Sequence, residues 1–150
     1  QVDTVLKRLH EVASIREKEL NEDTLIYNAN MTEMKPEVGH QLPIEMYREG
    51  YEYYVETHFH PNSHSCFLQR NLMDLMVYDP VQFMYLLDQP LLMMAGDHAD
   101  TNYMSEQAFE LAITTKEKEL YYLKDATHIQ TYYKESVVKE AIEKLDIFYK

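Results

Sequence analysis

The chain has 150 residues, of which 45% are hydrophobic and 27% are charged, as is usual for a globular domain. Its formal net charge of −12 argues against a nucleic acid or an anionic membrane as a partner, because both would repel it. No apolar run approaches the roughly 20 residues of a membrane-spanning helix, and the single cysteine excludes an internal disulfide, so we expect a cytoplasmic protein.

The first third of the chain predicts two helices separated by an irregular loop. Residues 2–20 have an amphipathic pattern, and residues 21–39 have no clear period. A second helix is predicted from Pro43 to about Thr57. The residues expected to face the core are Val2, Val5, Leu6, Leu9, Ala13 and Leu20 in the first helix, and Met46, Tyr47, Tyr51 and Tyr54 in the second.

A histidine-rich stretch follows, with His58, His60 and His64 inside seven residues. Zinc sites use histidines at short spacing, but Pro61 interrupts any helix or strand and no clear fourth ligand lies nearby. We therefore interpret the stretch as a polar loop and expect no metal and no cofactor. Cys66 is the alternative candidate for a nucleophile, although a lone cysteine is usually a small buried hydrophobe.

Helices are also expected on either side of the central segment. Residues 67–77 predict one helix, and Asp79 with Pro80 predicts the start of a short helix that ends at Leu86. Ser136 is expected to cap a last helix. The residues expected to face inward are Leu68, Leu72, Leu75 and Met76 in the first of these helices, and Val138, Ile142, Leu145 and Phe148 in the last.

Residues 89–130 organise the chain, because they read as strand, turn, helix, strand and turn. The runs at 91–95 and 119–123 predict two buried strands, and a helix capped by Ser105 is expected between them. Such a βαβ unit makes the strands parallel. Asp100 lies in the loop that follows the first strand, and His128 lies in the loop that follows the second. The two loops should meet beyond the carboxyl ends of the strands, where open α/β sheets carry their sites.

The sequence in this region resembles the C-terminal part of an α/β-hydrolase of the dienelactone-hydrolase-like and acyl-transferase-like branch. The resemblance is carried by residues 90–96, 99–101, 103, 105–106 and 126–129, with Arg70, Leu72, Tyr78 and Asp79 upstream. It covers residues 67–150 well and the first 66 residues more thinly. It implies that His128 is the general base and Asp100 the acid. Asp97 is the alternative acid, because the common spacing would place the acid at position 99.

The same resemblance implies a nucleophile that this chain lacks. A nucleophile elbow needs a Gly-x-Ser-x-Gly-type turn, and none of the three glycines lies two residues from a serine or cysteine. The family order of nucleophile, acid and base then places the nucleophile upstream of Gln1. We expect residues 1–66 to be a helical cap segment and residues 67–150 to be the C-terminal portion of the hydrolase.

The expected activity is that of a serine-type, or alternatively cysteine-type, hydrolase: the full-length protein would hydrolyse a small ester, thioester or related acyl substrate, with this chain inactive by itself. The alternative is a hydrolase-like module that binds protein and has no catalytic role. Two parallel strands leave open sheet edges, and open edges pair with other chains, so we also expect a homo-oligomer.

Overall fold

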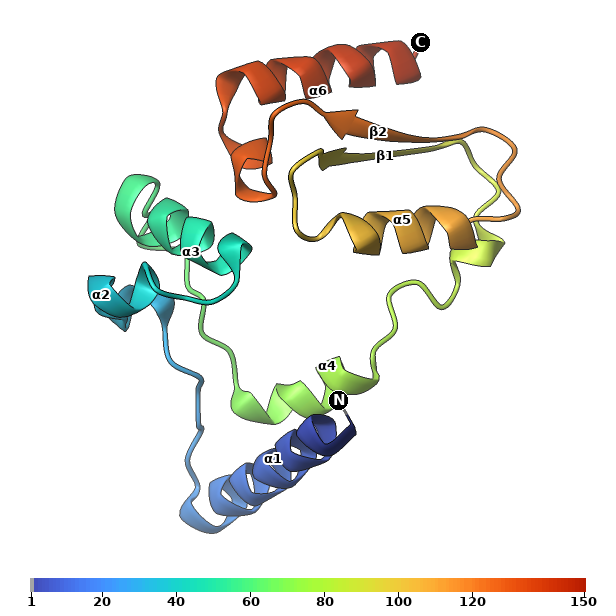
Figure 1. The fold of residues 1–150 in the computed structure, drawn as a ribbon. Coiled ribbons are helices and arrows are strands. Elements are labelled where there is room, and N and C mark those ends of the chain that lie inside the picture. The colour runs from blue at the N-terminus through green and yellow to red at the C-terminus, as the bar shows by residue number, and fades with distance from the viewer. Residues whose placement is uncertain (1) are drawn as a thin grey trace.

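A computed structural model describes residues 2–150 and shows a mixed α/β protein built around two parallel strands (Figure 1). The strands are β1 (Leu91–Gly96) and β2 (Lys118–Leu123), and they pair in register from Leu91 with Lys118 to Gly96 with Leu123. Helix α5 (Asn102–Leu111) connects them and covers one face of the sheet, while α6 (Glu135–Phe148) covers the other. The predicted parallel βαβ unit is therefore confirmed.

The core of this unit lies between β2 and α6. Leu123, Ala126 and Val137 are buried together, and Met94 and Tyr121 pack against them. The predicted burial of both strands is reached only in part, because residues 91–95 are half-buried. Among residues 2–150, β1 and β2 each have one strand neighbour, so each keeps an open edge.

The predicted starts of the two helices in this unit, α5 and α6, were both wrong. Helix α5 begins three residues before Ser105, with Thr101 at its N-cap, and α6 begins at Glu135 after Lys134. Neither N-cap side chain caps its helix by a hydrogen bond. The loop after β1 already turns back at Ala99, whose N–H donates to the carbonyl of Gly96 at 3.1 Å, so the helix starts early.

The remaining elements are short, apart from the first helix. They are α1 (Val2–Glu22), η1 (Met31–Glu33), α2 (Pro36–Gly39), α3 (Glu45–Tyr51), η2 (Glu52–Thr57), η3 (Gln69–Asn71), α4 (Leu72–Val77), η4 (Met84–Leu86) and η5 (Ile129–Tyr132). The predicted helix at 43–57 is thus present as α3, continued by a π-helical turn in η2. Of its four predicted core residues only Tyr51 is buried, whereas Tyr47 and Tyr54 are exposed. No helix within residues 2–150 is both long and apolar enough to cross a bilayer.

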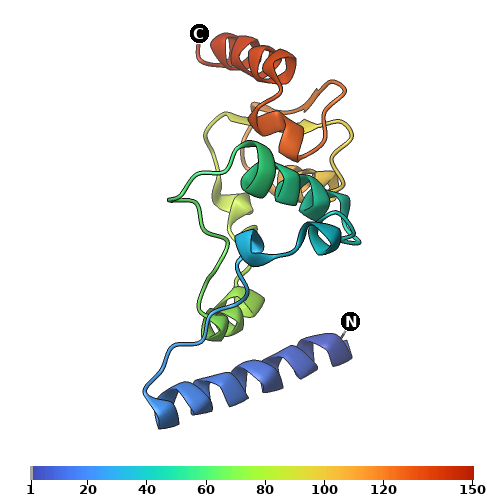
Figure 2. The ribbon, with the colours of Figure 1, turned by 90° about the vertical axis from the view of Figure 1, so that its left-hand side faces the viewer.

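Helix α1 extends as predicted, but it packs through a different face. Val12 and Glu19 are its buried residues, while Val2 and Leu20 on the predicted face are 71% and 85% exposed. The helix lies against η3 and α4, at the end of the molecule away from the sheet (Figures 1 and 2). The sheet and α6 therefore do not cover its apolar stripe.

The segment before β1 is less helical than predicted. The expected helix at 67–77 is split into η3 and α4, and Leu75 is 57% exposed instead of facing inward. The side chain of Asp79 accepts from the N–H of Val81 at 3.0 Å, as a cap would, but turns and η4 follow in place of an α-helix. An isolated antiparallel bridge joins Tyr27 to Leu68 and ties this segment to the loop after α1.

Candidate functional site

The loops that leave β1 and β2 are held together by backbone contacts. The N–H of Asp97 donates to the carbonyl of Leu123 at 2.9 Å, and the N–H of His98 donates to that of Ala126 at 3.0 Å. Gly96 is needed for this approach, since a Cβ there would overlap the carbonyl oxygen of Ala126. The parallel register brings both loops to the carboxyl end of the sheet, as the sequence predicts.

His128 lies in the second loop, directly before η5, and both of its ring nitrogens have partners. Nδ1 is 3.0 Å from the hydroxyl of Thr101, and Nε2 is 2.7 Å from the hydroxyl of Tyr132. The imidazole is half-buried. The structure thus brings His128 to the loop of residues 97–101, as expected, through Thr101.

Asp100 points instead to the segment that we expect to be the cap. One of its carboxylate oxygens accepts from the N–H of Met46 at 3.4 Å, in the first turn of α3. The hydrogen bond expected between His128 and an aspartate is absent from residues 2–150. The reason is that the carboxylate of Asp100 is engaged at the first turn of α3, while the hydroxyl of Thr101 occupies the place beside Nδ1.

Asp97 holds the two loops together. Its carboxylate accepts from the N–H of Ala126 at 3.1 Å. This backbone hydrogen bond lowers the pKa of Asp97, although partial burial opposes the effect, and the backbone N–H of Asp125 and the charge of His98 lower the pKa further. Asp97 therefore fixes the geometry of the loops and makes no hydrogen bond to His128.

An aromatic cluster lies beside His128 and contacts it through Tyr132. The ring of Tyr132 lies edge-on to the imidazole, with the ring centroids 5.4 Å apart. The ring centroid of Tyr53, in η2, is 5.8 Å from that of Tyr132 and 5.3 Å from that of Tyr133. His58 stacks on Tyr53 at 4.5 Å. Burial raises the pKa of the Tyr132 hydroxyl, and the neighbouring Tyr54 and Tyr53 raise it further.

Sequence reasoning missed Thr101 and Tyr132, although each had a local signal. Thr101 adjoins the predicted acid, and Tyr132 stands four residues after His128, a spacing that brings side chains together on a helical turn. Both could have been proposed as partners of the imidazole.

The other sequence candidates have local partners. His60 accepts from the N–H of Asn62 at 3.1 Å, and Nδ1 of His58 is 2.8 Å from the hydroxyl of Thr57. Cys66 is half-buried, and no hydrogen bond joins it to His128 in the part of the chain that the structure describes.

One group of side chains beside the candidate site could surround a cation. Potential ligand atoms of Asp97, His98 and Asp125 lie within 4.8 Å of one another. All three residues are exposed, and Asp97 is already bonded to Ala126. Exposed acidic groups often cluster without an ion, so we assign no metal to them.

Comparison with known proteins adds information on the fold alone. No family model matches the chain, and no curated protein does so. The chain is similar to the crystal structure of hypothetical protein PA2218 from Pseudomonas aeruginosa, with 20% identity and a TM-score of 0.77. The match covers 97% of this chain and 45% of that one, so the chain spans less than half the length of the solved protein.

Proposed function

We propose that this chain is the C-terminal part of an α/β-hydrolase, in which His128 is the general base and Asp100 the acid. The observation that supports this most is the meeting of the two loops, 97–101 and 125–128, at the carboxyl ends of adjacent parallel strands. Fold-level likeness to a chain more than twice as long agrees with a part of a larger protein. The residues 1–66 and 67–150 are then the cap and the C-terminal portion.

The hydrogen bonds of His128 fit a general base in one tautomer. If Nδ1–H donates to Thr101, Nε2 accepts a hydrogen bond from the hydroxyl of Tyr132. The same nitrogen would take the proton of a nucleophile once that nucleophile replaces the tyrosine hydroxyl beside it. Asp100 would stabilise the resulting imidazolium once the loop turns its carboxylate toward Nδ1. The nucleophile and the oxyanion hole would come from residues outside these 150, and the substrate would be a small ester, thioester or related acyl compound.

The direct test is aryl ester hydrolysis by a longer protein that contains this chain. His128→Ala should abolish the activity, and Asp100→Asn should reduce it by several powers of ten, as loss of the acid does in serine proteases. His98→Ala is the matched control, since His98 lies in the same pair of loops but is exposed and makes no side-chain hydrogen bond among the described residues. Full activity of the His128→Ala protein would contradict the proposal.

A second function, a binding module without catalysis, is favoured by one observation. Both ring nitrogens of His128 are occupied by neighbouring hydroxyl groups, and the ring of Tyr132 lies edge-on to the imidazole. A histidine with a purely structural role would look the same. A fluorophosphonate probe applied to the longer protein separates a serine hydrolase from a binding module, because only an activated serine should be labelled and should lose the label in His128→Ala.

A further inference from the structure

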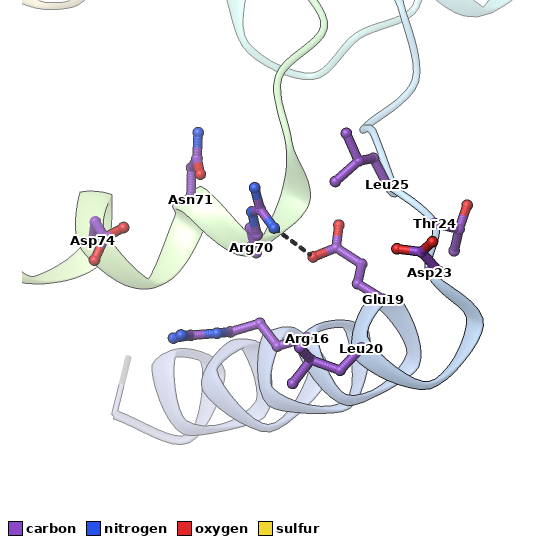
Figure 3. A pocket seen from close by; sticks show the side chains of 9 residues that line it. All are labelled: Arg16, Glu19, Leu20, Asp23, Thr24, Leu25, Arg70, Asn71 and Asp74. Atoms are coloured by element: carbon purple, nitrogen blue, oxygen red, sulfur yellow. Dashed lines mark ion pairs between the residues drawn. The ribbon is translucent and has the colours of Figure 1, made fainter.

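A pocket of about 470 Å³ lies between the C-terminal half of α1 and the segment of η3 and α4 (Figure 3). This volume falls in the range of small-molecule sites. Arg16, Glu19 and Leu20 line it from α1, Asp23 lines it from the turn after this helix, and the opposite wall contains Arg70, Asn71 and Asp74. The α1 residues recur at helical spacing, so one face of the helix carries both signs of charge.

Glu19 offers an unused acceptor at this pocket. Its side chain is only 5% exposed, and one carboxylate oxygen accepts from the N–H of Ile26 at 2.9 Å. The other oxygen, Oε2, is buried and has no hydrogen-bond donor, although a guanidinium nitrogen of Arg70 lies 3.5 Å away. Buried carboxylate oxygens normally have a donor. Figure 3 shows this carboxylate directed from α1 toward Arg70 across the pocket.

Arg16 offers the complementary unused group. It donates to the sulfur of Met73 at 3.2 Å, and a thioether is a weak acceptor. Within residues 2–150 no carboxylate forms an ion pair with Arg16. A guanidinium group matches the two oxygens of a carboxylate, which it binds through paired hydrogen bonds.

We propose that this pocket binds a small zwitterion of the amino-acid or dipeptide type. The ligand carboxylate would contact Arg16, and the ligand ammonium would donate to Oε2 of Glu19. The lining carries both signs of charge, with two arginines and three acids, so a zwitterion can pair each of its charges with an opposite one, whereas a simple anion or cation pairs with one sign only. Arg70 is 43% exposed, so its side chain can turn from Glu19 toward the ligand carboxylate as the ammonium enters.

The test is a titration of the chain with glycylglycine at millimolar concentrations, followed by the backbone ¹H–¹⁵N signals. The N–H of Ile26 reports on the site, since it donates to Glu19. We expect a saturable shift of this signal. Acetate carries only the carboxylate of the ligand and ethylamine only its ammonium group, so each should bind at least about tenfold more weakly than glycylglycine. Arg16→Gln should lower the affinity for glycylglycine by a similar factor.

Arg8→Gln is the matched control, because Arg8 lies on the same helix outside the pocket and pairs with Glu11 at 2.8 Å. It should leave the affinity unchanged. Glu19→Gln should weaken binding as well, and if that variant fails to fold, the exposed Arg16 still allows the test. The proposal is overturned if the Ile26 signal does not shift, if acetate binds as tightly as glycylglycine, or if Arg16→Gln binds like the unsubstituted chain.

Discussion

At the scale of single residues, the candidate site depends on how closely two backbones approach. Gly96 ends β1 in contact with Ala126, and Asp97 then bonds to the same residue through its side chain. These two positions fix where the following residues point. The imidazole of His128 consequently meets a hydroxyl group, while the carboxylate of Asp100 lies beside α3.

Gly96→Ala should destabilise the chain by about 1–3 kcal/mol, because the added Cβ forces the two loops apart. Gly50→Ala is the control, since a Cβ there would meet only Ile129, at 3.9 Å. In helix α3 this second change should be neutral, or stabilising by up to about 1 kcal/mol. Urea unfolding of both variants measures the difference, and equal effects would contradict the close approach.

The stability of the fold should depend on the ionisation of Asp97. Its pKa is lowered in the folded chain, chiefly by the backbone hydrogen bond from Ala126, so the folded state favours the carboxylate. The stabilisation is therefore present above the unfolded pKa of about 3.9 and is lost as the pH falls through the folded pKa. Unfolding free energies of the unsubstituted chain and Asp97→Asn should converge in that acid range. A difference that stays constant there would contradict the prediction.

At the scale of elements, α1 and α3 are held by contacts that their own sequences do not show. Helix α3 has no side-chain cap from Ile44, and Asp100 approaches its first turn from the loop after β1. Helix α1 is anchored through Val12 and Glu19 against η3 and α4. Long-range contacts, more than helical propensity, thus position both helices.

Asp100→Ala should destabilise the chain by about 1 kcal/mol, because α3 loses a carboxylate acceptor at its N-terminus. Asp100→Asn keeps an acceptor oxygen and should cost less. The measurement is urea unfolding, with amide exchange of Met46 as the local readout. Unchanged exchange in Asp100→Ala would show that the carboxylate does not cap α3.

The packing face of α1 can be tested with two valines. Val12 is 1% exposed and Val5 is 47% exposed. Val12→Ala should cost about 2 kcal/mol through loss of two buried methyl groups, whereas Val5→Ala should change stability by less than about 0.5 kcal/mol. Thermal or urea unfolding measures both changes. A larger loss of stability in Val5→Ala than in Val12→Ala would contradict this packing and favour the face predicted from the sequence.

At the scale of the whole molecule, apolar surface and open strand edges remain uncovered. In the part of the chain that the structure describes, β1 and β2 each pair with a single strand. Large apolar side chains such as Val77 and Ile113 are 79% and 73% exposed. Both features favour pairing with another chain or with further residues of a longer protein.

We therefore predict that the 150-residue chain self-associates through its sheet edge and does not hydrolyse aryl esters above the background of a generic histidine. Multi-angle light scattering across a dilution series should show a mass above the 17.9 kDa of the single chain. A stable monomer at all concentrations would contradict the association. Ester turnover that is lost in Cys66→Ala would instead identify Cys66 as a nucleophile.

The sequence by itself determined the parallel βαβ unit and the meeting of residues 97–101 with 125–128, because periodicity and parallel pairing are local or follow from the order of elements. It also predicted that residues 2–20 and 43–57 are helical. Only the tertiary structure decided that Thr101 and not Asp100 faces His128, and that α1 packs through Val12 and Glu19. Those choices depend on contacts between segments far apart in the chain, such as Gly96 with Ala126 and Asp100 with Met46, and local patterns carry no information about them.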